Sequence, residues 1–195
     1  SLNTLIGAFS ADALTTGTRN VALGYATLSD DTKGNRSTAL GYGCLAVQNF
    51  TTSTDNYNTA MGYLAGGGIT TGLRNTLIGG LAGDVLSDAD ENTALGYGAL
   101  SSDTLGSKST ALGRSALATQ NLSTATDSYN TAVGYFAGVS ITTGVQNTLV
   151  GGEVGEGLQD ADFNTAIGYL ALRTDTLGSK STAIGYAALK DQNFT

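Results

Sequence analysis

Polar and apolar residues alternate along this chain in one short pattern that returns many times. The pattern reads [N/S]-T-x-[aliphatic]-G, with Val21 once in place of the Thr, and it occurs eleven times. It stands in runs such as T-A-[I/L/V/M]-G-Y, which are too short for a helix and rich in residues that favour strands. Each copy therefore predicts one short β-strand. The copies begin at Asn3, Asn20, Ser37, Asn58, Asn75, Asn92, Ser109, Asn130, Asn147, Asn164 and Ser181.

The spacing of these copies predicts how the strands are arranged. Successive copies follow a 17-residue period, except for two 21-residue spacings, and residues 37–108 align without gaps on residues 109–180 as a 72-residue repeat. A fixed period of this kind is typical of solenoids, in which each repeat forms one coil. We predict an all-β parallel β-solenoid or β-roll of eleven stacked coils, on the order of 50 Å long. Residues 1–195 are expected to be one repetitive segment of a longer fibre.

Three sequence features predict the structure of a single coil. A small residue and then Leu or Gly stand three and four residues after the motif glycine, as Ala99 and Leu100 do after Gly96. This pair predicts a second, shorter strand before a closing turn. The motif glycine recurs from Gly7 to Gly185, which predicts a positive φ or a backbone too close for a Cβ. The Asn or Ser at the start of each copy predicts a ladder of side chains that hydrogen-bond from coil to coil.

The few large apolar residues per coil predict an assembly of several chains. The sixth coil has only Leu95, Tyr97 and Leu100 as sizeable apolar side chains, and Ala and Gly occupy the alternating positions. Small residues allow flat surfaces to approach closely, so burial is gained by packing columns side by side. We predict a parallel homotrimer that packs through this small-residue face.

Composition excludes several classes of function. The net charge is −7 and the pI about 4.3, so neither nucleic acid nor an anionic membrane surface is expected as a partner. No apolar run approaches the ~20 residues of a spanning helix, so membrane insertion is not expected. The chain lacks His, and its single cysteine, Cys44, stands where seven coils have Ala, which predicts a small buried side chain. We therefore expect no enzyme, no catalytic residue and no cofactor.

Clustered acidic residues raise the question of a calcium site. Hard cations prefer several carboxylate oxygens, but neither an EF-hand loop nor a calcium-binding nonapeptide repeat is present. The first copy of the cluster keeps only Asp12, so a solvated acidic face is expected and no metal. The clusters are Asp84, Asp88, Asp90 and Glu91 in one coil, and Glu156, Asp160 and Asp162 in its counterpart.

Two other functions of solenoids fit the sequence less well. A left-handed β-helix acyltransferase has coils of similar length, but it should repeat an aliphatic residue at every sixth position and needs a general base. An ice-binding face is suggested by the Thr ladder, but such a face should carry two ladders side by side. The next outward place is expected to hold Ala, Gly or Tyr, so Thr is interpreted as a strand residue.

The repeats resemble two families of trimeric fibres. Runs such as N-T-A-M-G-Y at 58–63 and N-T-A-V-G-Y at 130–135 resemble repeats of bacteriophage tail-fibre proteins. The aliphatic-Gly motif, once per coil, is similar to that of the left-handed parallel β-roll heads of YadA-like trimeric autotransporter adhesins. The resemblance covers essentially the whole chain and implies a trimeric fibre of a virion or a bacterial cell surface. The motif is closer to the tail fibres, so the expected function is a rigid shaft or head that contacts a host, with an autotransporter adhesin head as the alternative.

The four extra residues of each long coil predict a protruding loop. The loops lie within residues 48–57 and 120–129 and present an Asp, a Tyr and several hydroxyl groups. Such a mixture can bind a host cell-surface glycan, or a protein, through weak sites that recur along the fibre. The alternative is that each Tyr packs the loop onto the roll and each Asp caps the turn. The candidate receptor-binding residues are Asp55, Tyr57, Asp127 and Tyr129.

Overall fold

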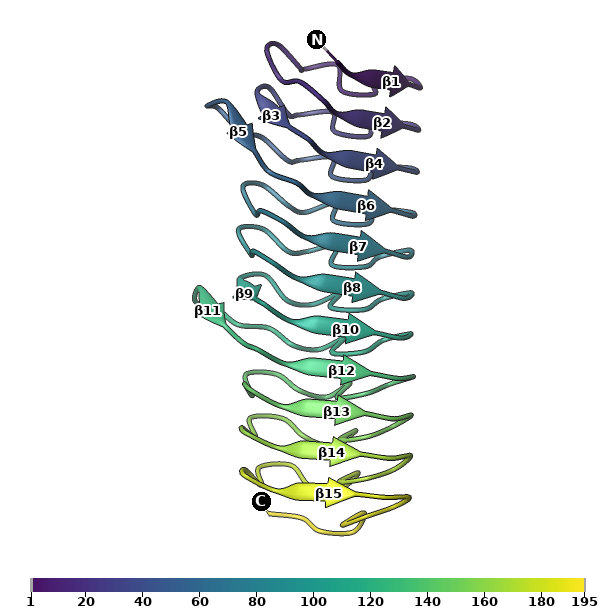
Figure 1. The fold of residues 1–195 in the computed structure, drawn as a ribbon, viewed down its shortest axis with the longest axis vertical. Coiled ribbons are helices and arrows are strands. Elements are labelled where there is room, and N and C mark those ends of the chain that lie inside the picture. The colour runs from purple at the N-terminus through teal and green to yellow at the C-terminus, as the bar shows by residue number, and fades with distance from the viewer. Residues whose placement is uncertain (1, 195) are drawn as a thin grey trace.

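The computed structural model describes residues 2–194, which form a rod of stacked β-coils without a helix (Figure 1). Eleven three-residue strands, one from each coil, form a single parallel sheet along the whole rod. The predicted all-β solenoid of eleven coils is thereby confirmed. The strands are β1 (Thr4–Ile6), β2 (Val21–Leu23), β4 (Thr38–Leu40), β6 (Thr59–Met61), β7 (Thr76–Ile78), β8 (Thr93–Leu95), β10 (Thr110–Leu112), β12 (Thr131–Val133), β13 (Thr148–Val150), β14 (Thr165–Ile167) and β15 (Thr182–Ile184).

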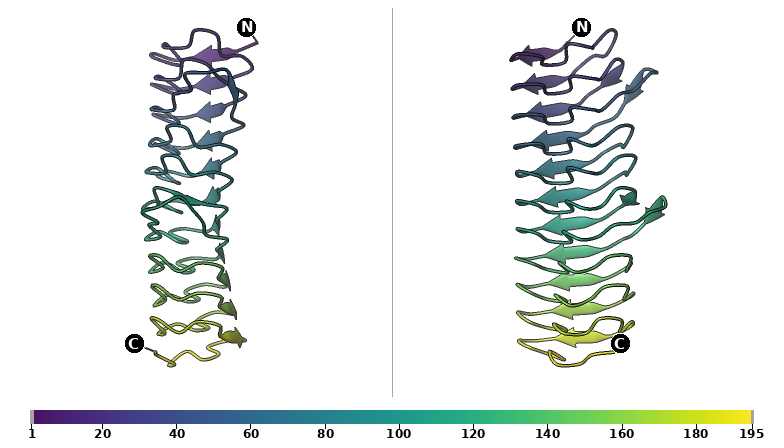
Figure 2. Two further views of the ribbon diagram at one scale, coloured as in Figure 1. Left: turned by 90° about the vertical axis from the view of Figure 1, so that its left-hand side faces the viewer. Right: turned by 180° about the vertical axis from the view of Figure 1, so that it is seen from behind.

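The register of this sheet follows the sequence repeat residue by residue. Ala111 of β10 lies opposite Ala94 on one side and Ala132 on the other. The same holds for every neighbouring pair, including those that the 21-residue coils connect, so like positions form columns along the rod (Figure 2). The four extra residues therefore leave the coil without disturbing the sheet.

The side of the strand that faces inward is opposite to the one we predicted. Ala94, the middle residue of β8, is fully buried, whereas Leu95 and Tyr97 are 50% and 57% exposed. Leu100, in the following turn, is fully buried. The coil is so narrow that its interior accepts a methyl group at the strand, and the larger side chains face outward. The surface available for packing between chains is therefore aliphatic and aromatic, and the small-residue face lies inside each coil.

In β7 and β13 leucine replaces the inward alanine, and glycines make room for it. Leu77 of β7 is fully buried. A Cβ added to Gly66 would lie 2.8 Å from Leu77 Cδ1, and one on Gly83 would lie 2.9 Å from Leu77 Cδ2. These glycines stand where other coils have a buried leucine such as Leu100, so each layer keeps a similar volume.

The prediction of a second strand in every coil is wrong for most coils in the described part of the chain. Leu100 has a φ of +53° and lies in a turn. Reversal of the chain within a few residues requires this left-handed conformation, which an extended strand cannot supply. Second strands of two residues occur only beside the long coils. There β3 (Gly34–Asn35) pairs with β5 (Thr54–Asp55), and β9 (Gly106–Ser107) pairs with β11 (Thr126–Asp127).

The motif glycines and asparagines join the coils as predicted. All eleven motif glycines have φ between +126° and +145°, and a Cβ on Gly96 would lie 2.4 Å from the carbonyl oxygen of Gly113. Asn147 accepts the backbone N–H of Asn164 at 3.0 Å through Oδ1, and donates through Nδ2 to the carbonyl of Ala161 at 2.7 Å. Each ladder asparagine thus closes its own coil and holds the next one.

Candidate functional site

The 21-residue coils have a serine in the ladder, and a buried glutamine links this serine to the asparagine of the next coil. Gln120 Nε2 donates to Ser109 Oγ at 2.9 Å and to a carboxylate oxygen of Asp103. Gln120 Oε1 accepts from Asn130 Nδ2 at 2.8 Å, and Asp103 also accepts the backbone N–H of Leu122 at 3.1 Å. This network anchors the start of the loop. The earlier long coil repeats it with Asp31, Ser37, Gln48 and Asn58.

The loops protrude from one edge of the rod, at β5 and β11 (Figures 1 and 2). Only their central parts leave the coil, because Gln120, Leu122 and Ser128 are buried within the predicted range 120–129. The short pairing of β11 with β9 holds the second loop against the preceding coil. The predicted loops are therefore present, and their exposed part is shorter than the ranges we assigned.

In the second loop, the two candidate residues lie around a lysine that sequence reasoning did not single out. Lys108 Nζ donates to Asp127 Oδ2 at 2.6 Å and lies 5.3 Å from the centre of the Tyr129 ring. The Tyr129 hydroxyl donates to Asp127 Oδ2 at 3.2 Å. This hydrogen bond, donated by Lys108, lowers the pKa of the Asp127 carboxyl group and raises the pKa of the Lys108 ammonium group.

The first loop has the same arrangement with an arginine. Arg36 Nε lies 3.0 Å from Asp55 Oδ2, and its guanidinium lies 5.3 Å from the centre of the Tyr57 ring. Both tyrosines are about half exposed, at 50% and 51%, and both aspartates are exposed. Arg36 and Lys108 each directly precede the ladder serine of a long coil, and that shared position was the signal that could have identified them.

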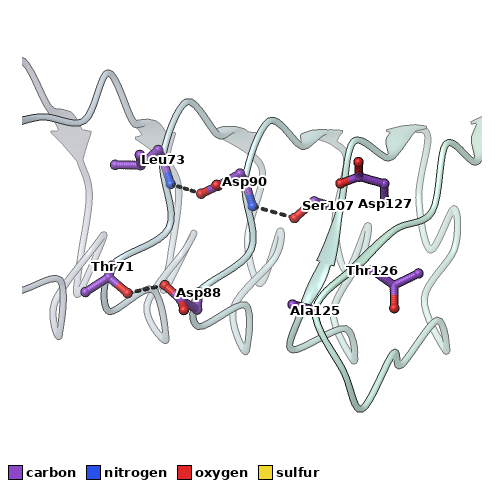
Figure 3. A pocket seen from close by; sticks show the side chains of 8 residues that line it. All are labelled: Thr71, Leu73, Asp88, Asp90, Ser107, Ala125, Thr126 and Asp127. Carbon is purple, nitrogen blue, oxygen red and sulfur yellow. Dashed lines mark hydrogen bonds between the residues drawn. The ribbon is translucent and has the colours of Figure 1, made fainter.

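An open recess of about 760 Å³ lies between the second loop and the coils that precede it (Figure 3). We call it the β11 recess. Asp88 accepts the Thr71 hydroxyl, and Asp90 Oδ1 accepts the backbone N–H of Leu73 at 2.7 Å. The lining residues are Thr71, Leu73, Asp88, Asp90, Ser107, Ala125, Thr126 and Asp127.

Part of the acidic cluster found in the sequence thus lines the β11 recess. Asp84 lies outside its lining, and burial raises the pKa of this carboxyl group. In the counterpart cluster, hydrogen bonds from the hydroxyl groups of Thr142 and Thr143 lower the pKa of Asp160. Within residues 2–194, no three Asp, Glu or Cys side chains are grouped as metal ligands.

The edge at which the strands end is a second surface of interest. Outward aliphatic residues and the tyrosines just past the motif glycines form two neighbouring columns there, which we call the apolar edge. Tyr42 stacks on Tyr25 at 5.2 Å and on Tyr63 at 5.5 Å between ring centres. The aliphatic column consists of Ile6, Leu23, Leu40, Met61, Ile78, Leu95, Leu112, Val133, Val150, Ile167 and Ile184, and the tyrosine column of Tyr25, Tyr42, Tyr63, Tyr97, Tyr135, Tyr169 and Tyr186.

Comparison of the chain with protein-family models, with curated proteins and with solved structures gave no match. The described part of the chain holds no helix with the length and apolarity needed to cross a membrane.

Proposed function

We propose that the chain is a rod segment of a homotrimeric attachment fibre, as in a phage tail fibre or a comparable surface adhesin. The observation that carries this proposal is the apolar edge. Its seven tyrosines are each 46% to 77% exposed, and at ~200 Å² per aromatic side chain they offer roughly 700 Å². Together with the aliphatic column this exceeds the ~300–600 Å² patch of a typical monomer and reaches the ~800 Å² that each partner contributes to a stable interface.

A second copy of this chain is the partner that best fits the apolar edge. The aliphatic column repeats once per coil over the full length of the rod, at about 4.8 Å, whereas four coils have Ala8, Gly80, Arg114 and Gly152 in place of the tyrosine. A partner must have the same axial repeat to match it over that length, and parallel copies of the rod do. Because the two apolar columns lie on either side of the glycine turn, each copy can offer one column to each of two neighbours. Contacts between two different surfaces of the same chain can close into a ring of copies, and we propose a ring of three.

The position of the loops supports a role in attachment. The loops lie on the edge opposite to the ends of the strands, so an assembly that buries the apolar edge directs β5 and β11 outward (Figure 1). Asp55 with Tyr57, and Asp127 with Tyr129, then stand on the outside of the fibre and are available to a host receptor. The closer resemblance to tail-fibre repeats favours a virion over a bacterial cell surface.

The mass of the assembly tests the proposal. Light scattering at micromolar protein should give about three times the chain mass of 19.6 kDa. Replacement of Leu95 and Tyr97 by Asp should lower the mass to that of the chain, whereas Thr124→Asp on the protruding loop should leave the trimer intact. A wild-type mass equal to that of a single chain would refute the trimer.

Ice binding is a second candidate function, and it would use the same face of the long sheet as the contact between chains. On the outer face of each strand, the residue next to Thr is the aliphatic residue of the motif, as Leu95 is next to Thr93. Our expectation of Ala, Gly or Tyr at this place is therefore wrong. Flat Thr and aliphatic columns would suit an ice plane if they remained exposed in the assembly. Thermal hysteresis by a monomeric protein would favour this second function, and a trimer without hysteresis would exclude it.

A further inference from the structure

We propose that the β11 recess binds a saccharide that carries hydroxyl or ammonium groups and no negative charge. This inference rests on the proposed attachment function and names the ligand class and the loop that binds it. It also makes the two loops unequal, because the site lies within residues 71–129 and the first loop has no equivalent of it.

The hydrogen-bonding groups of the recess are mainly acceptors. Among the described residues, the side chains of Asp88 and Asp90 each use only Oδ1 within the protein. The second oxygen of each carboxylate is left for a ligand. Ser107 Oγ accepts the backbone N–H of Asp90 at 2.9 Å, so its own proton is also available. A ligand with many O–H or N–H donors matches this set, and sugars carry such donors on adjacent carbons.

The charge of the recess excludes acidic sugars and phosphates. Asp88 and Asp90 have no cation within salt-bridge distance in the described chain, and the cation near Asp127 is already bound to it, since Lys108 Nζ lies 2.6 Å from Asp127 Oδ2. The chain as a whole carries a charge of −7, which adds to the repulsion of anions. An amino sugar therefore fits best, and a neutral sugar fits next.

An aromatic ring lies next to one residue that lines the recess, and we call this pair, Asp127 and Tyr129, the rim. Asp127 lines the recess, and the Tyr129 hydroxyl donates to it at 3.2 Å. Tyr129 is 51% exposed, and Lys108 lies over its ring. An exposed ring beside a row of acceptors can pack against the apolar face of a sugar while the hydroxyl groups turn toward the carboxylates.

The first loop lacks the acidic part of this arrangement. Thr16 and Thr18 are the counterparts of Asp88 and Asp90 in the 72-residue register, so no carboxylate precedes the first loop at these positions. Asp55 and Tyr57 repeat only the rim. We therefore expect the first loop to contribute little to sugar binding.

Calorimetric titration with short monovalent probes tests the inference, because short probes avoid avidity within the assembly. The probes are glucosamine oligomers, mannose oligomers and sialyllactose, titrated into the full chain. We expect glucosamine oligomers to bind best, mannose oligomers more weakly, and sialyllactose not to bind. Asp88→Asn should weaken glucosamine binding about tenfold through loss of a charge-assisted hydrogen bond, and Tyr129→Ala should also weaken it.

Two matched variants serve as controls. The first is Asp160→Asn. Asp160 is the counterpart of Asp88 in the 72-residue repeat and also accepts a Thr hydroxyl, but it does not line the recess. Asp55→Asn changes the first loop. Both should bind as the wild type does. Absence of binding by every probe, preferred binding of sialyllactose, or unchanged binding by Asp88→Asn would overturn the inference. The mass of the same samples separates this failure from that of the trimer, because an intact trimer that binds no sugar refutes only the recess.

Discussion

Removal of a single ladder asparagine should weaken the rod at one defined level. In Asn147→Ala, the backbone N–H of Asn164 loses its acceptor and the carbonyl of Ala161 loses its donor, at sites where the native distances are 3.0 Å and 2.7 Å. Asn147 is fully buried, so water does not replace the lost partners. A buried group left unpaired costs about 1–3 kcal/mol, and two of them predict a loss of about 2–6 kcal/mol in the free energy of unfolding.

Hydrogen exchange gives the direct measurement, because each coil contacts only its neighbours. The Asn164 amide should exchange much faster in Asn147→Ala, and urea unfolding should shift to lower concentration. Amides of the first coils, such as that of Asn20, should keep their protection. Thr148→Ala, on the exposed neighbouring residue, is the control and should cost less than about 0.5 kcal/mol. A loss below about 1 kcal/mol in Asn147→Ala would show that the ladder does not hold the coils together.

Three further changes test other parts of the structure. Gly96→Ala should cost more than about 3 kcal/mol in an unfolding assay, since it forces a Cβ to 2.4 Å from a carbonyl oxygen, whereas Gly185→Ala meets no atom within 4 Å and should cost clearly less. The lowered pKa of Asp127 means that its ion pair persists above the unfolded value of about 3.9 and is lost as the pH falls through the lower folded value. Lys108→Gln should therefore raise that pKa in an NMR titration, and an unchanged value would refute the pairing. Asn56→Ser should leave the melting temperature equal or higher, because the buried Asn56 Nδ2 has no partner in the described chain and the second loop has serine there; a lower temperature would show that the bonds accepted by Asn56 Oδ1 from Ser37 Oγ and the Asn58 N–H outweigh the unpaired Nδ2.

The stacking of the coils could be predicted because it depends on spacing alone. The 17-residue period brings like residues into one column, and the glycine and asparagine at fixed places identify the two backbone contacts between coils. The direction of the side chains could not be predicted from the same pattern. Ala94 and Leu95 are both apolar neighbours on a strand, and only the width of the coil decides that the methyl group faces inward.

The position of the candidate site could be predicted from the sequence, but the charged groups that surround it could not. Asp127 and Tyr129 were identified from the loop sequence, and both are exposed on the loop. Lys108 contacts both of them from the preceding coil, and Asp88 and Asp90 line the same recess as Asp127, because the solenoid stacks residues that are distant along the chain. A local sequence pattern does not indicate which acid of a preceding coil lies beneath a loop, since that depends on how far the loop leans over its neighbours.

The 72-residue register makes this rod adjustable in length. If residues 37–108 were deleted, Ser109 would follow Arg36 and would donate its backbone N–H to Asn20, as Ser37 does at 2.9 Å. Every coil would still meet a neighbour of the type it meets now, and the glutamine network of the next long coil would remain complete. Removal or addition of one 72-residue repeat would thus shorten or lengthen the rod by four coils while every contact between neighbouring coils is kept.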